Sequence, residues 1–229
     1  MENFSVLEQR LGIEFTRKEL LQQAFIHRSY LNEHPDSTLE HNERLEFLGD
    51  AVLELAVTKH LYKSYPNPEG DLTSWRAALV NSKMLAKIAE ETGFNDFLLL
   101  SRGETKDMGK ARQVIMANAV EAFIGALYLD KGFEEAEQFV VTHILKELPG
   151  IISQQLYRDA KSHFQEEAQD RAGITPTYEV LDEWGPDHAK HFVVGVYLGE
   201  ELVAKGEGSS KQEAQTDAAE KGLAAKGWS

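Results

Sequence analysis

The sequence NERLEFLGDAVL, from Asn42 to Leu53, decides the fold, and the rest of the chain is organised around it. In a helix, Glu43, Glu46 and Asp50 recur at the spacings of three and four residues that bring side chains together on one face. No Lys or Arg falls in this acidic stripe, and like charges four residues apart destabilise a helix by roughly 0.3 kcal/mol per pair. We therefore expect a group outside the helix to offset the repulsion.

Apolar side chains occupy the side of the same helix that lies away from the carboxylates. Leu45, Leu48, Val52 and Leu55 follow the helical period, which predicts a helix over residues 38–64 with one apolar and one acidic side. Two interpretations of the acidic side stay open. It is either a face exposed to water or a site for a hard cation such as Mg²⁺ or Mn²⁺, which prefer oxygen ligands.

A second stretch, Gln113 to Leu129, reads QVIMANAVEAFIGALYL and contains Glu121 as its only charged residue. A carboxylate in so apolar a helix lies in or beside a buried surface, where it needs a partner or a shifted pKa. Asn118 precedes it by three residues on the same face. One alternative is a salt bridge to an arginine such as Arg44, or a hydrogen-bonded structural carboxylate.

Together the two helices offer four side chains that bear oxygen: Glu46, Asp50, Asn118 and Glu121. Carboxylate and amide oxygens suit Mg²⁺ or Mn²⁺ better than transition metals that favour nitrogen or sulfur. The sequence therefore predicts a cage for one or two Mg²⁺ ions where the helices meet.

Composition limits the classes of protein to which the chain can belong. Its 229 residues suffice for one large or two small domains, and its net charge of −14 argues against a broad basic surface for a polyanion. Residues 1–157 carry a net charge of −8 and residues 158–229 carry −6, so neither half is basic. The chain has no cysteine, which suits a reducing cytoplasm, and we expect neither a secretory signal nor a membrane span.

The pattern of elements changes near residue 150. Before it, apolar periodicity predicts helices over residues 4–12, 17–27, 38–64, 71–92, 110–130 and 132–148. Pro149 and Gly150 are expected to end the last of these helices, with a connector over 151–157. After it, a helix over 159–172, strands over 177–181, 190–198 and 201–206, and a helix over 211–226 predict a small α+β domain with both helices on one sheet face.

The last helix opens with a feature that favours anions. Ser210 and Glu213 form a capping box, and Lys211 lies in the first turn, beside exposed amides and the positive end of the helix dipole. Such a terminus can bind phosphate. An ordinary capped helix with a surface lysine explains the same residues, and the sequence does not decide between them.

These stretches resemble the motifs of bacterial ribonuclease III. NERLEFLGDAVL is similar to its signature motif, and PEGDLTSWRAALVN (68–81) and ANAVEAFIGALYLD (117–130) resemble its other motifs in order and spacing. The C-terminal part resembles a double-stranded RNA-binding domain, with Phe164-Gln165-Glu166 in its first helix, Gly185 to His188 in a loop, and GEGSSKQEA (206–214) before its last helix. The similarity covers almost the whole chain.

The resemblance implies a multi-domain fold: an all-α nuclease domain over residues 1–150, a linker over 151–157, and an α-β-β-β-α RNA-binding domain over 158–228. It implies a cytoplasmic homodimer that cuts double-stranded RNA with Mg²⁺, or Mn²⁺ in its place, in rRNA, mRNA and tRNA processing. The products would carry a 5′-phosphate, a 3′-hydroxyl and a short 3′ overhang. No DNA or membrane partner is expected.

The resemblance also implies roles for individual residues. The catalytic residues would be Asp50 and Glu121, and the metal ligands Glu46, Asp50, Asn118 and Glu121. Glu43 would lie at the dimer interface, and Glu69 would reach across from the partner subunit. The RNA-binding residues would be Gln165, Glu166, His188, Ser210 and Lys211.

The sequence departs from the family pattern at two positions. Asn118 stands where many members have Asp, and Gln212 stands where the RNA-binding module often has a second Lys. The first departure lowers the negative charge of the predicted cage, and the second removes one phosphate contact. Asn118 is also the one feature that supports an alternative function, a non-catalytic RNA binder or chaperone on the same fold.

Overall fold

The computed structural model describes residues 4–106, 109–153, 160–186 and 190–228. The chain divides into two compact units, Met1–Tyr157 and Arg158–Ser229, each with its own hydrophobic core. We call them the N-terminal and C-terminal units. The predicted order of an all-α domain followed by a small α+β domain is confirmed.

The N-terminal unit is helical in all its longer elements. Its α-helices are α1 (Phe4–Leu11), α2 (Lys18–Ala24), α3 (Arg28–Glu33), α4 (Glu43–Ser64), α5 (Glu69–Val80), α6 (Ser82–Thr92), α7 (Lys110–Lys131), α8 (Phe133–His143) and α9 (Leu148–Ser153). Short 3₁₀ turns, η1 (Phe94–Phe97), η2 (Glu104–Lys106) and η3 (Leu145–Glu147), connect some of them.

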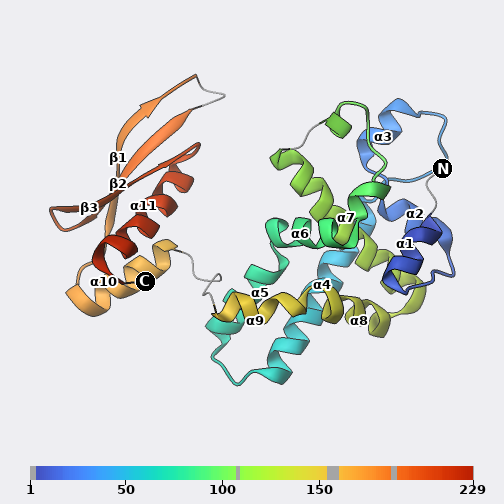
Figure 1. Cartoon of the computed structure of the whole chain (residues 1–229), viewed down its shortest axis with the longest axis horizontal. Coiled ribbons are helices and arrows are strands. Elements are labelled where there is room, and N and C mark those ends of the chain that lie inside the picture. The colour runs from blue at the N-terminus through green and yellow to red at the C-terminus, as the bar shows by residue number, and fades with distance from the viewer. Residues whose placement is uncertain (1–3, 107–108, 154–159, 187–189, 229) are drawn as a thin grey trace. The chain divides into compact units, whose positions relative to one another are not determined.

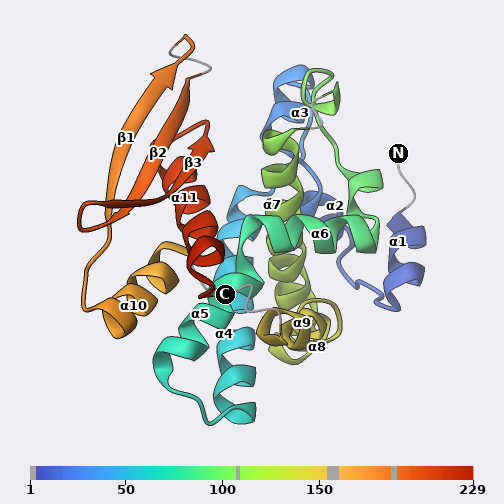
Figure 2. The ribbon, with the colours of Figure 1, turned by 60° about the vertical axis from the view of Figure 1, so that its left-hand side comes forward.

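Helix α7 is the centre of this unit. It packs against α2, α4, α6 and α8, and Figures 1 and 2 show these helices around it. Its residues from Ala122 to Leu127 are all buried. Phe123 lies among other aromatic rings, with centroid distances of 5.0 Å to Phe94 and 4.9 Å to Phe139. Because each buried ring removes a large apolar surface from water, this cluster fixes α7 in the core.

Several helices predicted for this unit differ from the structure: the one over 17–27 ends at Ala24, and the one over 132–148 ends at His143. Helix α4 begins at Glu43 rather than at residue 38, and α3 was not expected. The helix predicted over 71–92 is two helices, because Asn81 is extended (φ −73°, ψ 156°) and its side chain accepts a 2.9 Å hydrogen bond from the backbone N–H of Met84. Asn81 thereby ends α5 and caps α6.

Pro149 and Gly150 do not end the helical region as predicted. Both lie inside α9, which extends to Ser153 and so includes the first residues of the predicted connector. Proline is tolerated there because the first turn of a helix has no intrahelical partner for its missing N–H. Ile151 is buried in the core.

The C-terminal unit consists of α10 (Ala160–Ala172), a three-stranded antiparallel sheet and α11 (Lys211–Lys226). The strands are β1 (Thr177–Trp184), β2 (His191–Leu198) and β3 (Glu201–Gly208), in the order β1-β2-β3. Both helices cover one face of the sheet, as predicted (Figure 2). Helix α11 lies so close to β3 that a Cβ at Gly206 would be 2.1 Å from the backbone nitrogen of Ala218.

None of the helices among the described residues combines the length and hydrophobicity that a bilayer crossing requires.

Candidate active site

Helices α4 and α7 touch backbone to backbone, and two glycines make this possible. A Cβ at Gly49 would lie 1.7 Å from the carbonyl oxygen of Glu121, and a Cβ at Gly125 would lie 2.2 Å from that of Leu45. No side chain larger than hydrogen fits at either position unless the helices move apart. The contact sets the turn of α4 that carries Glu46 directly against the turn of α7 that carries Glu121.

The predicted carboxylates of the two helices do influence one another. Burial raises the pKa of Glu121 to about 7, and the charges of Asp50 and Glu46 contribute to the rise. Burial also raises the pKa of Glu46, as do the charges of Glu43 and Asp50, while a hydrogen bond from Asn118 opposes the rise. The structure therefore brings Glu46, Asp50, Asn118 and Glu121 together across the helix contact.

The chemistry of these side chains fits a hard cation. They offer three carboxylates and one amide oxygen. Every charged group that shifts the pKa of Glu46 or of Glu121 is an Asp or a Glu. No Lys, Arg or His among the described residues forms an ion pair with Glu46, Asp50 or Glu121. The alternative partner Arg44 is exposed and contributes nothing to the pKa of Glu121. Glu46 and Glu121 are half-buried and Asp50 is exposed, and negative charge that no cationic side chain balances suits a hard cation such as Mg²⁺.

The carboxylates of Glu46, Asp50 and Glu121 are not arranged as a coordination sphere in this structure. Within the described ranges, no group of three His, Asp or Glu side chains converges closely enough to hold a metal ion. These side chains would therefore have to move closer together to hold one cation.

Glu43 has an arginine and a histidine as neighbours, and neither belongs to α4. Its carboxylate lies 3.5 Å from the guanidinium of Arg28 and 3.8 Å from Nδ1 of His41. The ion pair with Arg28 offsets negative charge at Glu43 only, and the described residues give Glu46 and Asp50 no such partner. The spacing pattern could not reveal this ion pair, because Arg28 lies in a helix that was not expected.

The outward side of α4 is more apolar than predicted. Phe47, Leu55 and Tyr62 are 82%, 57% and 79% exposed. The prediction that Leu55 packs inward is wrong, because Leu53 and Ala56 occupy the buried side at that level. Helix α4 thus presents a stripe of large apolar side chains to its surroundings, which we call the α4 outer face (Phe47, Leu55 and Tyr62).

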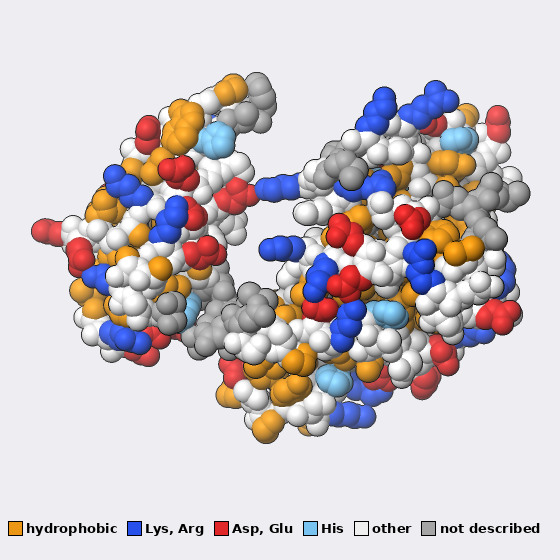
Figure 3. Space-filling view, in the orientation of Figure 1, with side chains coloured by type: hydrophobic (Ala, Val, Ile, Leu, Met, Phe, Trp, Pro, Cys, Tyr) orange, Lys and Arg blue, Asp and Glu red, His pale blue; other side chains and the backbone are white. Residues whose placement is uncertain are grey.

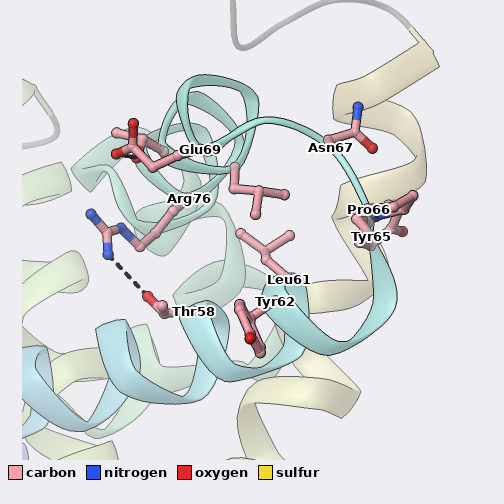
Figure 4. A pocket seen from close by; sticks show the side chains of 10 residues that line it. Thr58, Leu61, Tyr62, Tyr65, Pro66, Asn67, Glu69 and Arg76 are labelled. Atoms are coloured by element: carbon pink, nitrogen blue, oxygen red, sulfur yellow. Dashed lines mark hydrogen bonds between the residues drawn. The ribbon is translucent and has the colours of Figure 1, made fainter.

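A cavity of about 640 Å³ lies beside this face, between the second half of α4 and α5 (Figure 4). Glu69 and Arg76 of α5 line it, and Arg76 donates a 3.0 Å hydrogen bond to Oγ1 of Thr58. Glu69 accepts a hydrogen bond from Thr73 on its own helix. Glu69 therefore belongs to this cavity and not to the group around Glu121. Hydrophobic side chains gather on the surface around the α4–α5 connection (Figure 3).

The predicted RNA-binding residues of the C-terminal unit are exposed where the structure describes them. Gln165 and Glu166 lie on α10, and Ser210 caps α11 by accepting a 3.1 Å hydrogen bond from the backbone N–H of Glu213. Lys211 is exposed, with Nζ 5.7 Å from the centre of the Phe192 ring. His188 lies outside the described residues.

One polar contact in the C-terminal unit was not predicted from the sequence. Nζ of Lys161 on α10 donates a 2.7 Å hydrogen bond to the side chain of Gln215 on α11 and lies 5.1 Å from the centre of the Tyr178 ring. It ties the two helices that carry the candidate RNA contacts. Several other cations of the unit are ion-paired, such as Lys221 with Asp217 and Lys226 with Glu201. Figure 3 accordingly shows acidic and basic side chains intermixed.

Comparison with known proteins identifies the family to which this chain belongs. Residues 17–148 match the family described as ribonuclease-III-like, and residues 160–225 match the double-stranded RNA binding motif. The chain belongs to the ribonuclease III family. Two curated relatives named Ribonuclease 3 come from Oceanobacillus iheyensis, with 45% identity over 95% of this chain and 95% of the relative, and from Borreliella burgdorferi, with 44% identity over 95% and 89%.

A solved structure agrees with this assignment. The nuclease domain of ribonuclease III from Campylobacter jejuni is 44% identical, covers 64% of this chain and 99% of that domain, and superposes with a TM-score of 0.57. Its description mentions a region involved in dimer formation. Membership of the ribonuclease III family makes this chain an endoribonuclease that acts on double-stranded RNA, with the binding motif as its C-terminal unit.

Proposed function

We propose that this ribonuclease III uses Mg²⁺, or Mn²⁺ in its place, to hydrolyse phosphodiester bonds in double-stranded RNA. The observation that supports the proposal most strongly is the backbone contact of α4 with α7, which carries Glu46 and Asp50 to Asn118 and Glu121. Four oxygen-bearing side chains lie around this contact, and the charged groups that shift the pKa values of Glu46 and Glu121 are acidic. A hard divalent cation is the partner that this set lacks.

In this mechanism Glu46, Asp50 and Glu121 would hold the cation through carboxylate oxygens, and Asn118 would offer its amide oxygen. A bound divalent cation would lower the pKa of water and stabilise charge on the phosphate. Burial raises the pKa of Glu121 to about 7, so this carboxyl would have to be deprotonated to act as a ligand. The oxygen of water would bond to phosphorus as the bond to the 3′ oxygen breaks, and a proton from that water would end on the 3′ oxygen, which leaves a 5′-phosphate and a 3′-hydroxyl.

We propose that the enzyme works as a homodimer through the α4 outer face. Large apolar side chains that stay exposed as one stripe on a helix mark an interaction surface, and the cavity lined by Glu69 and Arg76 lies next to this one. In a dimer, Glu43 would lie near the interface and Glu69 would reach toward the partner. Two sites, each cutting one strand, would leave a short 3′ overhang.

The dimer has a direct test. Sedimentation of the unsubstituted chain should give twice the mass of one chain, and Tyr62→Arg should shift it toward the monomer because a charge cannot be buried cheaply at an apolar interface. Leu202→Arg, which changes an exposed leucine of the C-terminal unit, is the matched control and should sediment as the unsubstituted chain does. If the unsubstituted chain sediments with the mass of one chain, the proposed dimer is refuted.

The C-terminal unit would bind the RNA duplex through Gln165, Glu166, His188, Ser210 and Lys211. Protein modules of this kind recognise the A-form shape, 2′-hydroxyls and phosphates, so we expect no binding of duplex DNA. We place the enzyme in the cytoplasm, where rRNA, mRNA and tRNA precursors are its substrates.

Glu121→Gln tests the catalytic proposal. The substitution keeps the size of the side chain but removes the charge that the cation needs, so we expect cleavage of a long RNA duplex in Mg²⁺ to fall by at least roughly a hundredfold. Binding of the duplex in EDTA should not change. Glu135→Gln, at an exposed position on α8, is the matched control. Undiminished cleavage by Glu121→Gln would remove the mechanism.

A non-catalytic RNA binder is the competing function, and the amide at Asn118 in place of a carboxylate is the observation that favours it. Incubation of the unsubstituted protein with a duplex in Mg²⁺, and separately in EDTA, distinguishes the two. Cleavage only in Mg²⁺ supports the nuclease, and intact RNA in both reactions supports the binder.

A further inference from the structure

The sheet of the C-terminal unit has one face that no helix of this unit covers in the described part of the chain. Helices α10 and α11 lie on the other face, where Val194 and Val196 are fully buried (Figure 2). Side chains alternate between the two faces along a strand, so the positions on either side of these valines belong to the uncovered face. We call it the open sheet face, and its apolar residues are Leu181, Val193, Tyr197 and Leu202.

Apolar side chains from all three strands meet above Gly195, in the middle of the open sheet face. A Cβ at this glycine would lie 2.8 Å from Cδ1 of Leu202, 2.9 Å from Cε2 of Tyr197 and 3.1 Å from Cδ1 of Leu181. Leu181 reaches this place because the register of β1 shifts at this residue, as in a β-bulge. Leu181 and Leu202 are still 38% and 39% exposed, so the cluster is a surface patch and not part of the core.

Carboxylates surround this cluster. Glu179 and Asp182 of β1 and Glu207 of β3 pair with residues of β2 that lie on the open sheet face, and paired residues share a face. All three are exposed, and no Lys or Arg among the described residues forms an ion pair with any of them. Lys205 is the only Lys or Arg in the three strands. The patch is therefore apolar at its centre and acidic at its rim.

An acidic rim disfavours two kinds of occupant. The carboxylates would repel the phosphates of an RNA duplex, and the candidate RNA-binding residues Gln165, Glu166 and Lys211 belong to helices on the other face. A two-fold contact of this face with a second copy of itself would bring like charges together. The charge instead complements a protein surface that carries Lys or Arg around apolar side chains.

We propose that the open sheet face binds an amphipathic helix of a partner protein, with apolar side chains on the cluster and Lys or Arg beside the three carboxylates. Such a helix would pack on this face as α11 packs on the other, and the sheet would then be covered on both sides. The partner can bind while α10 and α11 hold RNA, and the proposal does not depend on the cation site.

The experiment uses the full chain, with a synthetic helix as the probe. The probe is a labelled peptide with leucines at helical spacing on one side and lysines on the other, titrated at about 0.15 M salt and followed by fluorescence anisotropy. A second peptide has glutamates in place of the lysines, and a third has the composition of the first in an order that breaks the helical period. We expect the first to bind at least about tenfold more tightly than either of the others.

Variants of exposed apolar residues locate the binding. Leu202→Thr removes apolar surface from the cluster and keeps a residue type that suits a strand, so it should weaken binding of the lysine peptide about tenfold. Val180→Thr is the matched control. Val180 is 43% exposed but pairs with Val194, on the side of the helices, so this variant should bind as the unsubstituted chain does.

Variants of the carboxylates test the charge of the rim. Glu179→Gln combined with Glu207→Gln should weaken binding of the lysine peptide about fivefold, because exposed ion pairs are individually weak. Glu220→Gln, at an exposed position of α11, is the control and should leave the affinity unchanged.

Each of three results would overturn the proposal: no binding of the lysine peptide, equal binding of the lysine and glutamate peptides, or equal binding by Leu202→Thr and the unsubstituted chain. Leu202→Thr should also bind an RNA duplex, and sediment, as the unsubstituted chain does. A loss of duplex affinity would assign the open sheet face to RNA, and a change in mass would assign it to a second copy of the chain.

Discussion

An alanine at Gly49 should separate the two helices that carry the candidate active site. Its Cβ would lie 1.7 Å from the carbonyl oxygen of Glu121 and 2.8 Å from the backbone nitrogen of Gly125. Both neighbours are backbone atoms in helix interiors, so neither can rotate away. Since carbon and oxygen approach to about 3.3 Å in ordinary contacts, α4 and α7 must move apart by about 1.5 Å.

The expected effects follow from this displacement. In an open helix, Gly→Ala stabilises by about 1 kcal/mol, but forcing an extra carbon into a packed contact costs about 1–3 kcal/mol. We therefore expect Gly49→Ala to lower the free energy of unfolding, although alanine has a higher helix propensity than glycine. A misplacement of about 1 Å at reacting groups can lower the rate about a hundredfold, so cleavage should fall by that order.

Two measurements and one control test the reasoning. Denaturant unfolding gives the stability, and single-turnover cleavage of a duplex gives the rate without the influence of product release. Gly150→Ala is the matched control, because a Cβ at that helical position meets nothing within 4 Å. If Gly49→Ala is as stable as the Gly150→Ala control and cuts within about twofold of the unsubstituted rate, the close helix contact does not position the site.

Three further predictions concern pH, stability and RNA binding. Because Glu121, with its pKa of about 7, must lose a proton to bind a cation, Mg²⁺ affinity measured by calorimetry should fall about tenfold per pH unit below 7 and stay level above it. Burial alone would raise the pKa of Asp130, but N–H donors from Thr16 and Arg17 hold it below its usual value. Asp130→Asn should therefore lower the free energy of unfolding by about 2 kcal/mol at pH 7, a difference that is present above the unfolded pKa and disappears as the pH falls through the folded one. Gln212→Lys should make the salt dependence of duplex binding steeper by about one phosphate contact, measured as the slope of log K against log salt concentration.

Apolar periodicity could predict the main helices but not the surfaces they pack against. The pattern in α4 and α7 has the helical period, so both helices were predicted within a few residues of their bounds. Periodicity does not say which side of a helix meets a neighbour. Leu55 was therefore assigned to the core, although it lies exposed on the α4 outer face.

The acidic residues of the candidate site could be predicted because charges stand out in apolar helices. Their support could not be, since it comes from distant parts of the chain. Nothing in the spacing shows that Gly49 faces Gly125. The ion pair of Arg28 with Glu43 depends on how α3 folds back, which no local pattern describes. Asn81 is different, because an asparagine followed by a helical stretch is a recognisable cap signal.

The central claim is that a divalent cation binds where α4 meets α7. Crystals of the full chain grown with Mn²⁺, with data that record the anomalous scattering of manganese, test it most directly. We expect an anomalous peak about 2.1 Å from carboxylate oxygens of Glu46, Asp50 and Glu121. Ordered Mn²⁺ elsewhere, with these carboxylates turned apart, would contradict the account.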